Sequence, residues 1–196
     1  MVVVVRIKLG SAEEIISVES KLRLICTASF YMLICVPVVS AAAQQIESCT
    51  LPQSLDNEFS TKYPGMRVVT LTDLDDYDRK RFQRDHGKRC PDLIRVDFFG
   101  DGKPTWAVVL ISEQNPKRKA ELVVSRQAAD GWEIRSLQTA DGTPVVWRQG
   151  PGKYEGVSGE KLIRATRPVI VLCGYGSWAI LYAWTGKEVE KVWLSD

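Results

Sequence analysis

The stretch VIVLCGYGSWAILYAW, residues 169–184, consists of two apolar runs on either side of Gly174-Tyr175-Gly176. Both runs are rich in β-branched and aromatic residues, and a short connection that contains glycine is typical of a β-hairpin. The second run, residues 178–184, is apolar at successive positions, as expected for a strand that is buried on both faces. This hairpin therefore predicts an antiparallel sheet with residues 178–184 near its centre.

The same alternation of apolar runs and turns extends over the C-terminal half of the chain. Turn pairs such as Asp130-Gly131, Asp141-Gly142 and Thr185-Gly186 recur about every 8–12 residues. Short strands joined by such turns indicate a mostly antiparallel, strand-rich meander. We expect its strands over residues 93–99, 106–111, 120–127, 132–137, 145–148, 169–173, 177–184 and 188–194.

A first helix is expected over residues 52–62, ahead of these strands. Leu55 and Phe59 are four residues apart and share one helical face. Thr50 is the residue expected to cap the N-terminus of this helix.

A second helix is expected within residues 72–90, where acidic side chains come first and basic side chains last, an order that matches the helix dipole. Its buried stripe is predicted at Leu74, Tyr77 and Phe82. Two helices followed by about eight strands predict an α+β fold. No linker divides this region, so we expect a single domain over residues 44–196.

The N-terminal part of the chain has the features of an export signal. A charge-free apolar run follows Lys21 and Arg23, and Ala41 and Ala43 supply the small residues that a signal peptidase requires. The pattern predicts a signal peptide over residues 1–43 and a periplasmic or secreted mature chain. The alternative is an uncleaved membrane anchor, which needs about 20 apolar residues.

Three glutamates in this leader, Glu13, Glu14 and Glu19, are unusual for a signal peptide. They favour a translation start downstream of Met1, at Val18 or Leu22. The intact mass of the exported chain would test both the start and the cleavage site.

The charge balance of the chain is close to neutral. The full sequence has 26 Lys plus Arg and 24 Asp plus Glu, and without residues 1–43 it keeps 22 basic and 21 acidic residues. Such a balance provides no long-range field, so we expect no nucleic-acid partner. After cleavage we also expect no stable membrane span. An envelope protein or a glycan is the expected kind of partner.

Three cysteines remain after the leader, namely Cys49, Cys90 and Cys173. In an oxidising compartment, two of them are expected to form a disulfide. Cys173 lies in an apolar run, where a thiol packs as a small hydrophobic group. The preferred pair is therefore Cys49–Cys90, and Cys90–Cys173 is the alternative.

No set of side chains in the sequence has the pattern of a catalytic site. His86 is the only histidine, and its place near the end of a helix is explained by the helix dipole. The aspartates at the start of the same helix, Asp73, Asp75, Asp76 and Asp78, have the same explanation. We therefore expect no catalytic residue.

Six tryptophans lie in the strand-rich part, and most are expected in the core. Trp147 lies close to the loop Gly150-Pro151-Gly152 and, with Tyr154, is a candidate aromatic platform for a glycan or a peptide. Core packing is the preferred interpretation of these two residues as well.

Residues 97–108, DFFGDGKPTWAV, form the sharpest local motif. They resemble the calcium-loop hairpin of FG-GAP and VCBS-type repeats, in which aspartates at alternate loop positions and a later aspartate surround the ion. Asp97 and Asp101 match two of these positions, whereas Phe99 and Thr105 replace two others. Because calcium prefers six to eight oxygen ligands, a plain hairpin turn is preferred, and a calcium cofactor held by Asp97 and Asp101 is the alternative.

The C-terminal residues 182–196 are similar to the closing W-x-G-K hairpin of uncharacterised exported bacterial proteins that have FG-GAP-like segments. This resemblance implies a periplasmic or secreted location and a β-rich body. It implies no activity.

Three functions remain open from the sequence. The preferred one is a non-enzymatic exported module that binds an envelope component, because the chain combines many strands and abundant tryptophan with no recognisable catalytic set. The second is a calcium-dependent hydrolase that uses Asp97 or Asp101. The third is a structural, calcium-free remnant of an FG-GAP-like fold.

Overall fold

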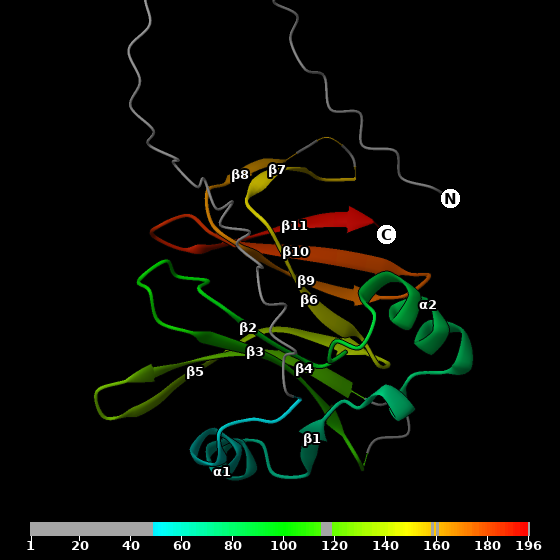
Figure 1. Ribbon diagram of the computed structural model, residues 1–196, viewed down its shortest axis with the longest axis vertical. Coiled ribbons are helices and arrows are strands. Elements are labelled where there is room, and N and C mark those ends of the chain that lie inside the picture. Colours follow the sequence, from blue (N-terminus) through cyan, green and yellow to red (C-terminus); the bar gives the residue numbers. More distant parts are fainter. Residues whose placement is uncertain (1–48, 115–118, 158, 160, 196) are drawn as a thin grey trace, which may run out of the picture. The chain divides into compact units, whose positions relative to one another are not determined.

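Two antiparallel sheets form the body of the structure, a computed structural model that describes residues 49–114, 119–157, 159 and 161–195. In the first sheet, β1 (Met66–Val68) and β2 (Leu93–Val96) both pair with β3 (Thr105–Ser112), and β4 (Lys119–Ala128) and β5 (Gly131–Asp141) follow. The second sheet has the order β11 (Val189–Ser195), β10 (Trp178–Trp184), β9 (Val169–Gly174) and β6 (Val145–Gln149). The strands β7 (Gly152–Glu155) and β8 (Leu162–Ala165) pair separately (Figure 1).

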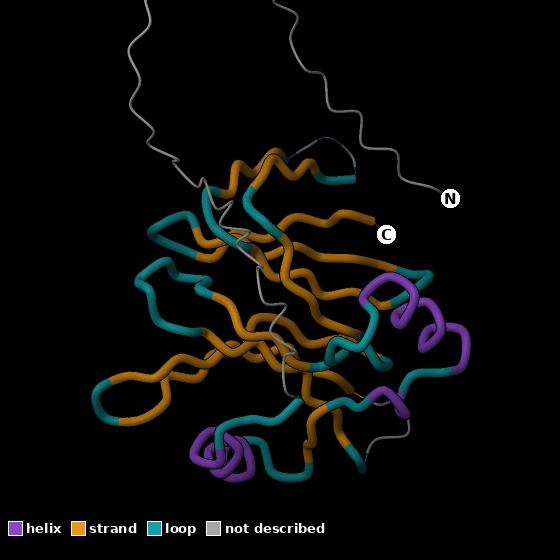
Figure 2. The backbone as a smooth tube through the Cα atoms, viewed as in Figure 1, coloured by secondary structure: helices purple, strands orange, loops and turns teal. Residues whose placement is uncertain are grey.

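The helices precede almost all of these strands in the chain. They are α1 (Gln53–Lys62), the short 3-10 helix η1 (Leu71–Asp73) and α2 (Asp76–His86), and they lie at the periphery of the strands (Figure 2). The predicted α+β fold, with two helices and many antiparallel strands, is therefore confirmed. None of the helices in the described residues is long and apolar enough to cross a membrane. The predicted leader, residues 1–43, lies outside the described residues.

The main core lies between the two sheets. Alternate residues of β3, Ala107, Val109 and Ile111, pack against Ile170 and Leu172 of β9. The intervening residues of β3 point to the other face of the first sheet, as the two-residue period of a strand requires. Both faces of β3 are thus covered, which explains why residues 106–111 are apolar at nearly every position.

Helix α1 covers the outer face of the first sheet. Leu55 and Phe59 are buried against strand residues such as Leu110, as the predicted helical face requires. The helix begins at Gln53, and no side chain caps its N-terminus, so the prediction of a Thr50 cap is wrong. Pro52 occupies the N-cap position instead, where its fixed backbone angle suits the start of a helix.

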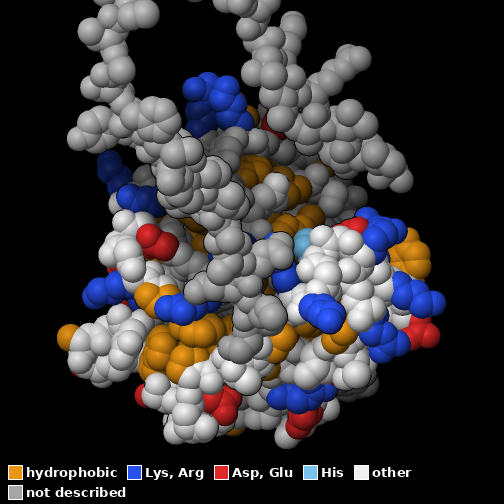
Figure 3. Space-filling view, in the orientation of Figure 1, with side chains coloured by type: hydrophobic (Ala, Val, Ile, Leu, Met, Phe, Trp, Pro, Cys, Tyr) orange, Lys and Arg blue, Asp and Glu red, His pale blue; other side chains and the backbone are white. Residues whose placement is uncertain are grey.

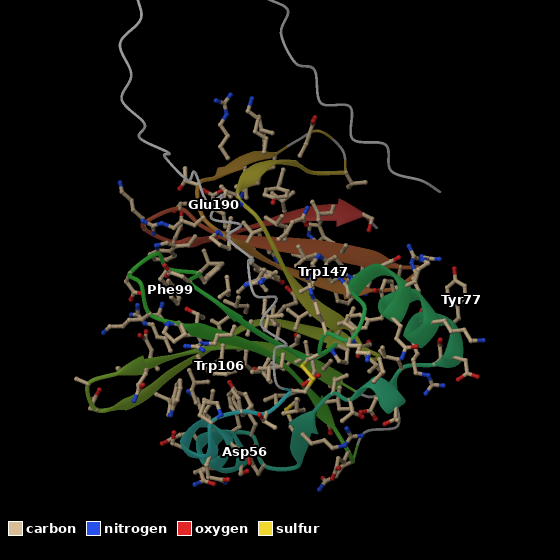
Figure 4. The ribbon with its side chains drawn as sticks, in the orientation of Figure 1. Asp56, Tyr77, Phe99, Trp106, Trp147 and Glu190 are labelled. Atoms are coloured by element: carbon tan, nitrogen blue, oxygen red, sulfur yellow. A yellow bond between two sulfur atoms is a disulfide. The ribbon has the colours of Figure 1, made fainter. Side chains whose placement is uncertain are left out.

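Helix α2 packs against one end of the second sheet. The Asp75 carboxylate caps it by accepting the backbone N–H of Asp78 at 2.8 Å, and Gly87 ends it with a φ of 68°. Phe82 is fully buried, but Tyr77 is 70% exposed, so the predicted stripe is wrong at Tyr77. Tyr77 lies on the outer side of α2, away from Trp147 (Figure 4).

The two sheets meet at the peptide segment that follows Cys90. The backbone N–H of Val146 in β6 donates to the carbonyl of Pro91 at 2.7 Å, and that of Val109 in β3 donates to the carbonyl of Asp92 at 2.8 Å. Consecutive carbonyl groups therefore bind different sheets. This long-range arrangement makes the connectivity more than a simple meander, since β6 pairs with β9 rather than with β5.

A disulfide between Cys49 and Cys90 fixes the start of this segment, with the two Cα atoms 5.5 Å apart (Figure 4). The preferred cysteine pairing is thus confirmed, and the alternative pairing of Cys90 with Cys173 is wrong. Cys173 is a free, buried thiol that packs beside Phe82 and Val145.

Candidate functional site

A surface cavity of about 390 Å³ lies beside the disulfide. Three segments form its walls: the link between β1 and η1, the end of α2 with the residues that follow it, and the disulfide segment itself. Its apolar lining comes from Val68, Val69, Leu71 and Pro91, and its polar lining from Thr70, Gln83, Lys88, Arg89 and Asp92. An apolar cavity with a few converging polar groups is the usual form of a small-molecule site.

Asp92 is the most unusual of these residues because it is a carboxyl group only 4% exposed. Burial raises the pKa of Asp92 to about 7, a hydrogen bond from its own backbone N–H opposes this, and the negative charge of Asp73 raises it further. No cation pairs with Asp92 in the part of the chain that the structure describes. The carboxyl group therefore lacks the compensation that a buried charge normally requires.

Asp73, next to the cavity, is stabilised in its ionised form. The Arg67 guanidinium donates two hydrogen bonds to its carboxylate, at 2.7 and 2.6 Å, and the Thr70 hydroxyl donates one at 2.7 Å. These hydrogen bonds, above all those from Arg67, hold the pKa of Asp73 well below its usual range. Asp73 thus remains an anion with its own partners, while Asp92 changes protonation near neutral pH.

The cavity also has a basic side. Lys88 and Arg89 follow α2 directly and are exposed. Neither forms an ion pair with a carboxylate of the described residues. Lys and Arg side chains gather over the α2 side of the molecule in the space-filling view (Figure 3). The cavity thus combines a buried acidic group with two cations that have no carboxylate partner in the described part of the chain.

A second cavity, of about 450 Å³, lies between the ends of β3, β4 and β5. Its charged lining residues are Lys119, Glu121 and Asp141, and none of them is buried. Since exposed charges are well solvated, this cavity contains no group that requires a ligand.

In the candidate calcium loop, the Asp101 side chain interacts with residues of the protein itself. One Asp101 carboxylate oxygen accepts the backbone N–H of Lys103 at 3.0 Å, and the other lies 3.7 Å from the Arg126 guanidinium. Asp97 is exposed. In the described residues, no group of three or more His, Cys, Asp or Glu side chains is arranged to hold a metal ion. Calcium at Asp97 and Asp101 stays a prediction.

Trp147 and Tyr154 lie in the same hydrophobic cluster, where both contribute to packing. Both rings are partly buried in the cluster under β7 and β8. The Trp147 ring also lies 4.8 Å from that of His86, and the Tyr154 hydroxyl donates to the carbonyl of Gly150. Burial lowers the pKa of His86, so its imidazole is a neutral ring between Trp147 and Phe82. Ligand contact by Trp147 and Tyr154 stays a prediction.

Sequence reasoning did not identify the Asp92 cavity. Its local signal was an aspartate between Cys90-Pro91 and the apolar run that begins at Leu93, which is a weak pattern because aspartate is common before a strand. The walls come from segments up to about 40 residues apart, and only the folded chain brings them together. Comparison of this chain with models of protein families, with curated proteins and with solved structures found no match.

Proposed function

We propose that the protein is an exported, non-enzymatic module that binds a small ligand in the cavity lined by Asp92. The observation that carries this proposal is a carboxyl group 4% exposed, in a cavity of about 390 Å³, with no cationic partner in the described residues. A buried, unpaired carboxyl group is unfavourable for folding, and such groups are commonly kept for binding.

Two features support export. The sequence of the leader has the pattern of a signal peptide. The Cys49–Cys90 disulfide fits an oxidising compartment such as the periplasm or the extracellular space.

The contents of the cavity support binding over catalysis. Proton transfer and nucleophilic attack normally use a second group close to the first, most often a histidine or a thiol. His86 packs against Trp147 and Phe82, and Cys49 is held in the disulfide. The lining therefore offers groups that recognise a ligand and no evident nucleophile–base pair among the described residues.

Ultrafiltration followed by mass spectrometry tests this function. The purified protein is mixed with the low-molecular-mass fraction of a cell-envelope extract, and retained compounds are compared with those retained by Asp92→Asn, which keeps the shape of the side chain. Asp130→Asn, at an exposed turn, is the matched control. We expect a compound that the wild type and Asp130→Asn retain and Asp92→Asn loses. Retention of nothing, or equal retention by all three proteins, would contradict the proposal.

A further inference from the structure

The charges that line the Asp92 cavity define the chemistry of the molecule that would fill it. Asp92 supplies the acidic pole, and it is 4% exposed. A carboxylate in this position is compensated by a donor of N–H bonds, and most strongly by a cation. Asp73 does not compete for that cation, because Arg67 already neutralises it through two hydrogen bonds.

Lys88 and Arg89 supply the basic pole of the same cavity. They are exposed, and neither has a carboxylate partner among the described residues. Arg67 cannot take their role, since it is bound to Asp73 and lies 3.0 Å from Glu113. A guanidinium group and an ammonium group at one site favour a carboxylate or another small anion.

The two poles together favour a ligand that carries both charges. A ligand with only a positive charge would meet Asp92 but be repelled by Lys88 and Arg89. A ligand with only a negative charge would be repelled by ionised Asp92. A molecule with both charges satisfies all three side chains, and the apolar residues Val68, Leu71 and Pro91 provide contact for a small hydrocarbon part.

We infer, on the basis of the proposed function, that the ligand is a small zwitterion, an amino acid or a short peptide. Its ammonium group lies against Asp92, and its carboxylate lies against Lys88 and Arg89. The volume of about 390 Å³ is at the lower end of ligand cavities and suits a molecule of this size. The neutral side chain of Gln83, which also lines the cavity, can donate to or accept from a peptide group.

Isothermal titration calorimetry with defined probes tests this inference. The probes are the L and D forms of alanine and of alanyl-alanine, together with N-acetyl-alanyl-alanine and alanyl-alanine amide. We expect binding of at least one free zwitterion. Blocking either its amine or its carboxylate is expected to weaken binding about 10- to 100-fold, because each block removes a charge-assisted hydrogen bond.

Substitutions test whether Asp92 forms the acidic pole and whether Lys88 and Arg89 form the basic pole. Asp92→Asn is expected to weaken binding of the free zwitterion by about 10-fold or more, and so is the double variant Lys88→Gln/Arg89→Gln. The matched control is Lys153→Gln/Arg164→Gln, which removes one lysine and one arginine from an exposed pair on β7 and β8. This control is expected to bind like the wild type.

The outcomes separate this inference from the proposed function. If blocked and free peptides bind equally, or if no probe binds while the ultrafiltration experiment still finds an Asp92-dependent compound, the zwitterion inference is wrong and the binding function stands. If neither experiment finds a bound compound, both are wrong.

Discussion

Asp92 and Asp73 lie close enough to influence each other, yet their pKa values move in opposite directions. Burial raises the pKa of Asp92 to about 7, whereas hydrogen bonds from Arg67 hold that of Asp73 well below its usual range. Environments that separate two carboxyl groups in this way are frequent at functional sites. The difference arises from burial at Asp92, which has no cationic partner in the described residues, and from the Arg67 guanidinium at Asp73.

This difference predicts how stability depends on pH. The pKa of Asp92 rises from an ordinary 3.8 to about 7 on folding, so the folded state binds the additional proton between these values. The contribution of Asp92 is therefore most favourable below about pH 4 and is lost as the pH rises to 7, with a limit on the order of 4 kcal/mol. Urea unfolding of wild type and Asp92→Asn at pH 5, 6, 7 and 8 measures the effect.

Asp92→Asn should gain stability relative to the wild type as the pH rises through this range, because asparagine carries no charge. His86, whose pKa is lowered, acts in the opposite direction, and Asp73 and Arg67, which are paired with each other, keep their charge. All of these groups are present in both proteins, so the difference isolates Asp92. A difference that does not change with pH would show that Asp92 is not buried as a neutral acid.

At the scale of elements, Asp78, Phe82 and His86 lie four residues apart on one face of α2, where Phe82 is buried and the other two are half-buried. The sequence pattern predicts Tyr77 on the buried face instead. Leu74 and Phe82 were correctly predicted to be buried, but Leu74 precedes α2, so it does not report the orientation of the helix. Burial raises the pKa of Asp78, so this polar side chain shares the half-buried face, which hydrophobic periodicity alone does not reveal.

Phe82 and Tyr77 should respond very differently to truncation. Phe82→Ala removes a fully buried ring and is expected to destabilise the fold by about 3–5 kcal/mol. Tyr77→Ala removes a ring that is 70% exposed and is expected to change stability by no more than about 0.5 kcal/mol. Urea unfolding at one pH distinguishes the two, and similar losses in both variants would mean that α2 packs through its other face.

The turn between β2 and β3 is expected to be indifferent to calcium. Asp101 is already bound to the Lys103 N–H and lies near Arg126, so a chelator should leave the melting temperature unchanged. Asp101→Asn should cost about 1 kcal/mol or less, since its ion pair is partly exposed. A melting temperature that falls in excess chelator and recovers with added calcium would instead support the calcium loop.

At the scale of the whole molecule, the sequence predicts the structural elements that depend on residues close together in the chain. The hairpin of residues 169–184 and the two helices follow local rules, and all are present. The stacking of two sheets and the pairing of β6 with β9 depend on contacts between distant segments, for which periodicity gives no signal. The Asp92 cavity belongs to this second group, because its walls come from three such segments.

The disulfide stabilises the whole fold by restricting the unfolded chain. Its cysteines are 41 residues apart, a loop for which the chain-entropy relation gives about 4 kcal/mol. Cys49→Ser/Cys90→Ser is therefore expected to unfold at a markedly lower urea concentration than the wild type. Cys173→Ala is the control, since its free thiol is not part of the disulfide. A reductant should destabilise Cys173→Ala as much as the wild type but leave the double variant unaffected.

The consecutive carbonyl groups of Pro91 and Asp92 have a consequence for motion. They hold the amide protons of Val146 and Val109, which belong to different sheets. Displacing the segment that contains these two successive peptide groups would release both protons to solvent in a single event. Deuterium uptake at the Val146 and Val109 amides should therefore increase together under mildly denaturing conditions. Opening of one sheet would then be detected at an amide of the other sheet.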